Sequence, residues 1–374
     1  MQYRLEKIPV ETPAPTATLS RSVDGRGEEL LDTLSRRRAS SEDRRLTAGE
    51  LRVHHVSPEG VTLAWESSGG PRPVGGELLD VLRRWTGWGR REFMHRLYES
   101  PGSTRRRFER AVEERGESWG GFFVRLLEGR VRALLPGDYR PVDHLEAASA
   151  FRDECVRWRQ RGVDVRLASC EESHGDLFLA ACAPSLAAEV TEGDWLYAGL
   201  ALANSECSPE PLEVRPRIYR AVCANGAIAQ EAEAEGFEIR KSEFPHPTPA
   251  VCLAEPRSFR ERLAHSFELA FRPERVEREA AIDRAASRAT LVNPFEHVQH
   301  LVARDLLSED ERDLVQRLFE EESDSSLYGL ANAVTAAAHT RLRARPRRAS
   351  ALEQLGGAIA RGDVGPPVGA PVWV

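Results

Sequence analysis

The stretch from Arg130 to Gly226 most constrains the fold, because short strand-like runs follow one another closely there. One helical pattern, "VDHLEAASAFRDECVRWRQRG", places Leu145, Phe151 and Cys155 on one face, and Gly162 ends it. Four strand-like runs come next: "VDVRLASCEES", "LFLAACAP", "DWLYAGLALANSE" and "PLEVRPRIYRAVCANG". Dense consecutive strands of this kind predict an antiparallel meander with the helix packed on one face.

The segments before this stretch predict two hairpins and three helices. "LRVHHVSPEGVTLAWES" alternates on both sides of residues 57–60, which predicts a hairpin. Helical spacing then covers about Glu77 to Arg115, with Ser103 as a candidate N-cap of the third helix. "GGFFVRLLEGRVRALLPGDYR" predicts a second hairpin that turns at Glu128-Gly129 and ends in the loop at residues 136–138.

The chain divides into four predicted regions. They are a flexible N-terminal arm over 1–45, an α+β core domain over 46–230, a linker or excursion over 231–254 and a helical C-terminal region over 255–374. The arm is polar and broken, with a short helix at Glu28–Arg37 as its one structured candidate. In the C-terminal region Ser308 and Glu311 fit a capping box. The predicted fold class is α+β: an antiparallel sheet flanked by helices and followed by a mostly α-helical region.

Charge is distributed unevenly along the chain. The 374 residues carry a net charge of -7, so no overall charge favours a polyanionic partner. Residues 83–140 differ, with fourteen arginines against eight acidic residues. Of the 52 basic residues only two, Lys7 and Lys241, are lysine. Codon usage in a GC-rich genome accounts for this arginine excess without any functional demand.

Cysteine spacing and hydropathy indicate in which compartment the protein resides and whether it binds zinc or a membrane. The six cysteines form no CxxC pair, which argues against a zinc finger or ribbon. Most of them lie in apolar runs, which is typical of reduced, buried thiols in a cytoplasmic protein. The first fifteen residues lack the apolar segment of a signal peptide, and no run is long enough for a membrane span. We therefore expect a cytoplasmic protein with no membrane partner.

Motifs for catalysis are missing from the sequence. Neither a glycine-rich phosphate loop nor a G-x-S-x-G elbow is present. His297 and His300 share a helix face, but their spacing differs from that of a zinc protease, so surface or core histidines are favoured. Cys223 with a distant His174 or His144 would make a nucleophilic pair, although a packed core thiol is the favoured interpretation. We predict no catalytic residue, no metal site and no cofactor.

Arginine interleaved with aromatic residues gives the one lead toward a ligand. Guanidinium groups bind backbone phosphate and aromatic rings stack on bases, which together suit a groove for single-stranded nucleic acid. The aromatic residues at helical spacing, Trp85, Phe93 and Phe108, are favoured as core residues instead. The predicted contact residues lie in a loop and in strands: Tyr139, Arg140, Arg215, Arg217 and Arg132.

Four segments resemble one known family. They are "LLDVLRRWTGWGRREFMHRLYE", "RVRALLPGDYRPVDHLEAASAF", "GLALANSECSPEPLEVRPRIYRAVCANGAI" and "SSLYGLANAVTAAAH" with "LEQLGGAI". In this order they resemble the phage/plasmid-like family called domain of unknown function 932, over roughly residues 75–360. Gly137 stands where that family usually has serine. The resemblance implies a mobile-element context and supplies no catalytic residues.

Three functions follow as hypotheses. The first is a non-enzymatic protein that binds single-stranded DNA in recombination, replication or defence of a mobile element, with a homo-oligomer as a further expectation. The order strand, helix, strand, strand, strand also resembles single-strand annealing proteins, as a fold-level analogy. The second is an enzyme acting on a small molecule or nucleotide. The third is a scaffold whose acidic helical C-terminal part binds a protein.

Overall fold

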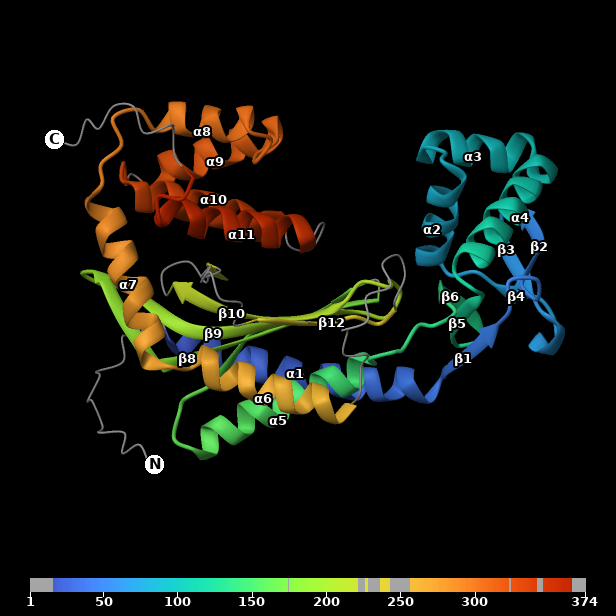
Figure 1. The fold of residues 1–374 in the computed structure, drawn as a ribbon, viewed down its shortest axis with the longest axis horizontal. Coiled ribbons are helices and arrows are strands. Elements are labelled where there is room, and N and C mark those ends of the chain that lie inside the picture. The colour runs from blue at the N-terminus through green and yellow to red at the C-terminus, as the bar shows by residue number, and fades with distance from the viewer. Residues whose placement is uncertain are drawn as a thin grey trace.

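The fold is α+β, as the sequence predicts. The computed structural model describes residues 16–173, 175–220, 226–227, 236–242, 256–322, 324–341 and 346–364. Within these residues it contains eleven α-helices and three antiparallel sheets. Figure 1 shows a central sheet with helices beneath it, an N-terminal lobe at one end and a C-terminal helical bundle above the other end.

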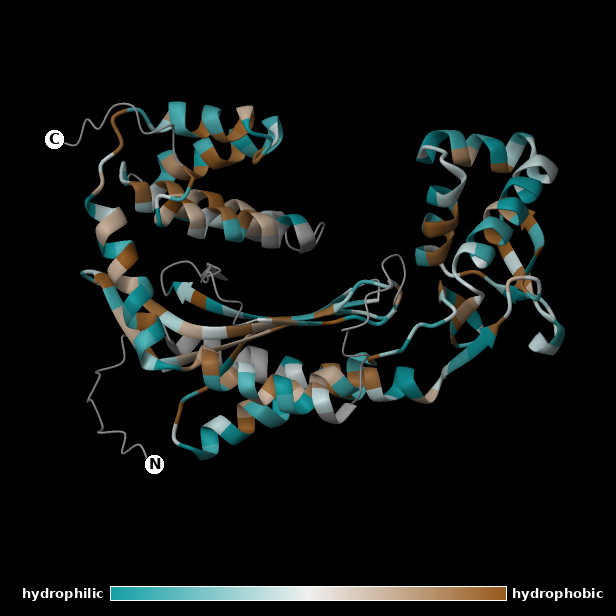
Figure 2. Ribbon diagram, viewed as in Figure 1, coloured by the Kyte–Doolittle hydropathy of each residue, from teal (hydrophilic) through white to brown (hydrophobic). Residues whose placement is uncertain are grey.

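The central sheet is the predicted meander. Its strands are β7 (Arg166–Ser173), β8 (Asp176–Thr191), β9 (Asp194–Ser205), β10 (Leu212–Arg220), β11 (Gly226–Ala227) and β12 (Phe237–Ile239). They pair in the order β11-β10-β9-β8-β7, and β12 also pairs with β10. Small residues and Leu alternate along β9, so one face is apolar and continuous with the core. Figure 2 shows hydrophobic residues along the middle of these strands.

Four helices cover the apolar face of the central sheet. They are α1 (Thr16–Ala39), α5 (His144–Gln160), α6 (Pro256–Ala270) and α7 (Pro273–Arg288). Aromatic rings lock α5 to α6: Phe151 meets Phe267 edge-on at 5.3 Å, and Trp158 meets Phe271 at 5.4 Å. Each such pair stabilises the core by roughly 0.5–1.5 kcal/mol beyond the burial of its area. The helix predicted after residue 143 is thus the one that packs on the sheet.

The N-terminal lobe has its own hydrophobic core. Its strands are β1 (Ser41–Leu46), β2 (Arg52–Ser57), β3 (Gly60–Ala64), β4 (Arg72–Pro73), β5 (Phe122–Leu127) and β6 (Arg130–Pro136). Its helices are η1 (Glu66–Ser68), α2 (Gly76–Thr86), α3 (Arg90–Glu99) and α4 (Pro101–Ser118). Both predicted hairpins and all three predicted helices are confirmed. Phe93 and Phe108 are buried and Trp85 packs beside them, which confirms the core interpretation of these rings.

The C-terminal region is helical, as predicted, and the part of it after α7 forms a bundle. It comprises α8 (Pro294–Ala303), α9 (Glu309–Glu322), α10 (Leu327–Arg341) and α11 (Pro346–Ala360), around a third core. The capping box of α9 is confirmed: the Ser308 amide donates to Glu311 at 2.9 Å, and the Glu311 amide donates to the Ser308 hydroxyl at 3.3 Å. Arg348 of α11 pairs with Glu311, so this ion pair joins α11 to the first turn of α9.

Four expectations need correction. The arm interpretation is wrong for residues 16–45, because α1 packs Leu34 into the main core and β1 pairs with β5 along its whole length. The linker interpretation is wrong for residues 236–242, which add β12 to the sheet and bury Lys241. The predicted core over 46–230 holds two separate hydrophobic clusters, one in the N-terminal lobe and one under the central sheet. Ser100, and not Ser103, is the N-cap residue of α4.

Candidate functional site

The predicted contact residues do not line one groove. Tyr139 is fully buried, with its ring against Phe123 at a centroid distance of 5.4 Å. Its backbone carbonyl accepts a hydrogen bond from Arg45 at 2.8 Å. Arg140, its neighbour, is exposed, and its backbone amide donates to the Lys241 carbonyl at 2.6 Å. Of this loop pair only the arginine is therefore accessible to a ligand.

Arg215 and Arg217 share one face of β10, as the alternation along the strand predicts. Arg217 is buried and binds Glu353 of α11 at 2.7 Å, with its guanidinium 5.2 Å from the Phe178 ring centroid. Arg215 is half-buried between Glu213, at 3.0 Å, and Glu238, at 2.9 Å. Both guanidiniums are neutralised by carboxylates, so neither offers a free charge to phosphate.

Arg132, the fifth predicted residue, belongs to a buried polar junction. We use this name for the charged and polar side chains between the N-terminal lobe and the central sheet. Arg132 of β6 binds Glu206 at 2.9 Å, and only 13% of each side chain is exposed. Nearby, Arg125 of β5 binds Asp143 at 2.5 Å and Asp43 at 3.0 Å. Asp143 lies at the N-cap position of α5, but its carboxylate pairs with arginine and makes no cap hydrogen bond.

A neutral histidine organises the centre of the junction. Asn204 donates through Nδ2 to His144 Nδ1 at 2.9 Å, so the ring donates from Nε2 to the Gly175 carbonyl at 2.9 Å. Burial lowers the pKa of His144, which agrees with a neutral ring. The His144 amide donates to Glu206 at 2.7 Å. Burial alone would raise the pKa of Glu206, but the surrounding cations and this amide outweigh it and lower the pKa.

Lys241 completes the junction from the segment after β12. Its Nζ donates to the Ser205 carbonyl at 2.5 Å, and the side chain has no exposed surface. Burial, and then the charge of Arg125, lower the pKa of Lys241 to about 7. Burial also raises the pKa of the Cys207 thiol to about 11, so this thiol is not an activated nucleophile.

The junction gathers residues from motifs that lie far apart in the sequence. Residues 139–144 of "DYRPVDH" meet residues 204–206 of "ANSE". A buried set of paired ions and a neutral imidazole is suited to holding elements in a fixed arrangement. The carboxylates are engaged by arginines and amides, so none is free to act as a general base.

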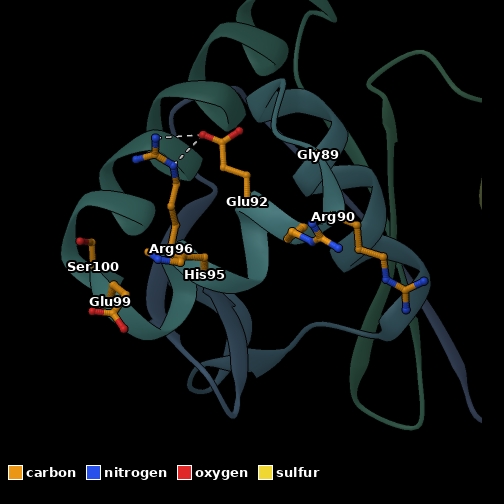
Figure 3. Close-up of a pocket in the computed structure, with 8 residues that line it drawn as sticks. Gly89, Arg90, Glu92, His95, Arg96, Glu99 and Ser100 are labelled. Carbon is orange, nitrogen blue, oxygen red and sulfur yellow. Dashed lines mark hydrogen bonds and ion pairs between the residues drawn. The ribbon is translucent and has the colours of Figure 1, made fainter.

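An open depression of about 740 Å³ lies instead on α3, at the outer end of the N-terminal lobe. Its lining includes Arg90, Arg91, His95 and Arg96. Figure 3 shows the side chains of Arg90, His95 and Arg96 projecting from this helix. We call residues 89–106, which carry five arginines against two glutamates, the arginine tip. The tip is a cationic surface, in contrast to the neutralised arginines of the sheet.

The side chains of the arginine tip differ in their freedom. Arg96 pairs with Glu92 at 2.9 Å and lies 4.9 Å from the Trp88 ring centroid. Across the described part of the chain, no ion pair or hydrogen bond engages the side chains of the exposed Arg90 and Arg91. Tyr98, about two turns further along the same helix, is 64% exposed. The helix thus presents exposed guanidiniums at its start and an accessible aromatic ring near its end.

A second buried polar cluster joins the central sheet to the C-terminal bundle. Asp194 of β9 accepts from Arg220 at 2.8 Å and from the Tyr328 hydroxyl of α10 at 3.1 Å. Burial, and then the nearby Glu279 and Asp194 carboxylates, raise the pKa of Asp283 in α7 to about 7. Nearby like charges and burial favour the protonated form of Asp283, so the charge of the cluster changes with pH near neutrality.

The remaining sequence candidates support no reactive site. His297 and His300 lie on α8, and no group of three metal-ligating side chains occurs within the described ranges. Cys155 and Cys182 are buried, as the apolar runs around them predict. Cys223 and His174 lie outside the described residues. Among the helices that the structure describes, none has the length and apolar character that a membrane span needs.

The sequence contained a signal for the arginine tip. The net positive charge of residues 83–140 points to this part of the chain, but the predicted contact residues lie in a loop and in strands and not among the exposed arginines of α3. Lys241 was visible only as one of two lysines. No family model, curated protein or solved structure matches this chain.

Proposed function

We propose that this protein binds single-stranded nucleic acid through the arginine tip, without catalysing a reaction. The observation that carries the proposal is the coincidence of the open depression on α3 with free, exposed arginines. Guanidinium groups bind phosphate oxygens in a bidentate manner, which a flexible single strand accommodates easily. In line with the family resemblance, we place this activity in recombination, replication or defence of a mobile element.

The aromatic residues of the tip favour single strands over duplexes. Tyr98 is the most exposed of the tip's rings, and base stacking on such a ring contributes roughly 1–3 kcal/mol per base. In a duplex the bases stack on each other and their faces are unavailable to Tyr98. The proposal therefore includes a preference for unpaired bases over a duplex of the same length.

One observation bears on the enzymatic alternative. His144, Glu206, Cys207 and Lys241 converge in the buried junction. Their ionised members are paired, and His144 and Lys241 are fully buried, so the junction supports a structural role better than chemistry on a substrate. The non-enzymatic proposal rests on this contrast with the open tip.

Fluorescence anisotropy with a labelled oligothymidine tests the proposal at low salt. We expect the double variant Arg90→Ala/Arg91→Ala to bind at least tenfold more weakly, since each lost phosphate contact removes a charge-assisted interaction. Two matched controls keep binding: Arg110→Ala, which removes an exposed arginine paired with Glu114, and Arg215→Ala, whose guanidinium is already paired.

The outcomes separate the site from the function. If the double variant keeps its affinity and Arg215→Ala binds more weakly, the nucleic-acid contacts lie on the central sheet and not on the arginine tip. No binding by the unaltered protein at low salt would refute the function itself.

A further inference from the structure

The N-terminal lobe, residues 41–136, meets the rest of the molecule at a narrow junction. The chain crosses it twice, at Ser40 between α1 and β1 and at residues 137–143 between β6 and α5. Figure 1 shows the lobe beyond the end of α1, to one side of the central sheet. Because lobe and sheet each have a hydrophobic core, a rotation between them opens neither core.

The contacts across the junction are mainly polar. Arg132 binds Glu206 at 2.9 Å, and Arg125 binds Asp143 at 2.5 Å. The apolar part is small: Phe123, Ala133, Leu135 and Tyr139 form it, with Cys207 packed against them. Ion pairs and a small apolar patch hold an angle between two bodies but give way more easily than a shared core.

Several polar atoms of the junction lack a partner in this arrangement. Tyr139 Oη, Arg125 Nη1 and Asn204 Oδ1 are buried, and none forms a hydrogen bond within the described part of the chain. Buried polar atoms are nearly always paired in folded proteins, since leaving one unpaired costs free energy. A second arrangement of the junction that pairs these atoms would therefore compete with the one seen here.

We propose that the N-terminal lobe is a hinged arm, and that the Arg132–Glu206 and Arg125–Asp143 pairs lock its angle to the central sheet. Ser40 joins the two bodies, because its amide donates to Arg37 of α1 and its carbonyl accepts from Glu128 of the lobe, both at 3.1 Å. At the second crossing Gly137 stays with the lobe through its amide bond to the Trp119 carbonyl at 3.3 Å, so the change of angle there falls on the residues after it. The arm carries the arginine tip at its outer end, so the hinge sets where the tip lies relative to the sheet. The hinge does not depend on the tip binding nucleic acid.

Single-molecule energy transfer measures the angle directly. Fluorophores are attached through a ketone-bearing amino acid in place of Met94 on α3 and of Glu320 on α9, which are both exposed. We expect one dominant transfer efficiency for the otherwise unaltered protein. Glu206→Gln and Arg132→Gln each weaken the lock, so the efficiency distribution shifts or broadens in both. Salt at about 1 M reduces the screening length in water to about 3 Å. Because the two pairs are largely buried, it broadens the efficiency distribution of the unaltered protein less than either variant does.

The control is Glu114→Gln, which breaks the exposed Arg110–Glu114 pair within the same lobe and leaves the distribution unchanged. Circular dichroism identifies any variant that fails to fold, and the salt titration needs no junction variant. One result overturns the hinge: the same narrow distribution in high salt and in every folded junction variant. The energy-transfer experiment contains no nucleic acid. A failure of the hinge is therefore distinguishable from a failure of the protein to bind oligothymidine.

Discussion

Lys241 shows at the scale of one residue how burial selects a side chain. Fifty of the 52 basic residues are arginine, yet the basic side chain with no exposed surface in the junction is a lysine. An ammonium group can lose its proton when it is buried, whereas a guanidinium stays charged in proteins. Charged groups face Lys241 from several elements: Arg125 of β5, Asp176 of β8, and Glu206 and Glu210 after β9.

The depressed pKa of Lys241 predicts a dependence of stability on pH. The folded pKa is about 7 and the unfolded pKa is about 10.4, so the unfolded state binds more protons between these values. The free energy of unfolding therefore rises with pH from 7 toward 10 and falls as pH returns to 7. Lys241→Met lacks this rise. Between the two ends of the pH range, the free energy of unfolding of the unaltered protein should increase by on the order of 1–3 kcal/mol more than that of the variant. Urea unfolding at pH 7, 8 and 9 measures it.

The control for Lys241→Met is Arg110→Met, which removes an exposed cation and keeps the pH dependence of the unaltered protein. An equal rise in free energy of unfolding for Lys241→Met and the unaltered protein would contradict the assigned pKa.

Asp283 predicts the opposite trend. Its folded pKa of about 7 exceeds the usual aspartate value of about 3.9, so the folded state binds the extra proton. Its contribution is full below about pH 3.9 and is lost progressively as pH rises from there to about 7. Asp283→Asn keeps a neutral side chain at every pH and should stabilise the protein by on the order of 1–4 kcal/mol at pH 8, with little change at about pH 3.5. Thermal unfolding at the two pH values tests this, with the exposed Glu320→Gln as control.

At the scale of elements, a buried ion pair holds the C-terminal bundle in its position against the central sheet. Arg217 of β10 and Glu353 of α11 have exposed side-chain fractions of 6% and 1%. Glu353→Ala leaves a buried guanidinium without its partner and should cost about 3–5 kcal/mol of unfolding free energy. The double variant Arg217→Met/Glu353→Leu removes both charges and should recover most of that loss. Chemical unfolding distinguishes the two variants, and a double variant as unstable as the single one would contradict this account.

Local signals made most elements predictable from the sequence. Glu128 and Gly129 both have positive φ, at 52° and 75°, as a two-residue hairpin turn requires, and this pattern is visible in the residues themselves. The Ser308–Glu311 capping box is equally local. The candidate helix at Glu28–Arg37 falls within α1, but its packing is not predictable from the sequence, because Leu30, Leu31 and Leu34 are few and are buried by contacts with the distant α5 and β7.

The site was less predictable than the elements, for a physical reason. Tyr139 and Arg140 are neighbours in one loop, yet one is buried against β5 and the other is exposed. Arg217 is paired by Glu353, which lies 136 residues further along the chain. Burial and ion pairing of this kind depend on contacts between distant segments, and residue type alone cannot supply them.

At the scale of the whole molecule, the charges of the protein are arranged in two ways. In the junction and under the C-terminal bundle, arginines are buried and paired with carboxylates, where they fix the positions of elements. At the arginine tip they are exposed at the far end of a separate lobe. A protein with net charge -7 can still bind a polyanion if its free cations gather on one surface.

The salt dependence of oligothymidine binding tests this account most directly. Each phosphate neutralised by the protein lowers the slope of log K against log salt by about 0.7 for a single strand. We predict that Arg90→Ala/Arg91→Ala makes the slope shallower by about 1.4, the loss of two phosphate contacts, while Arg110→Ala leaves it unchanged. Equal slopes for the double variant and the unaltered protein would contradict the claim that the arginine tip is the nucleic-acid interface.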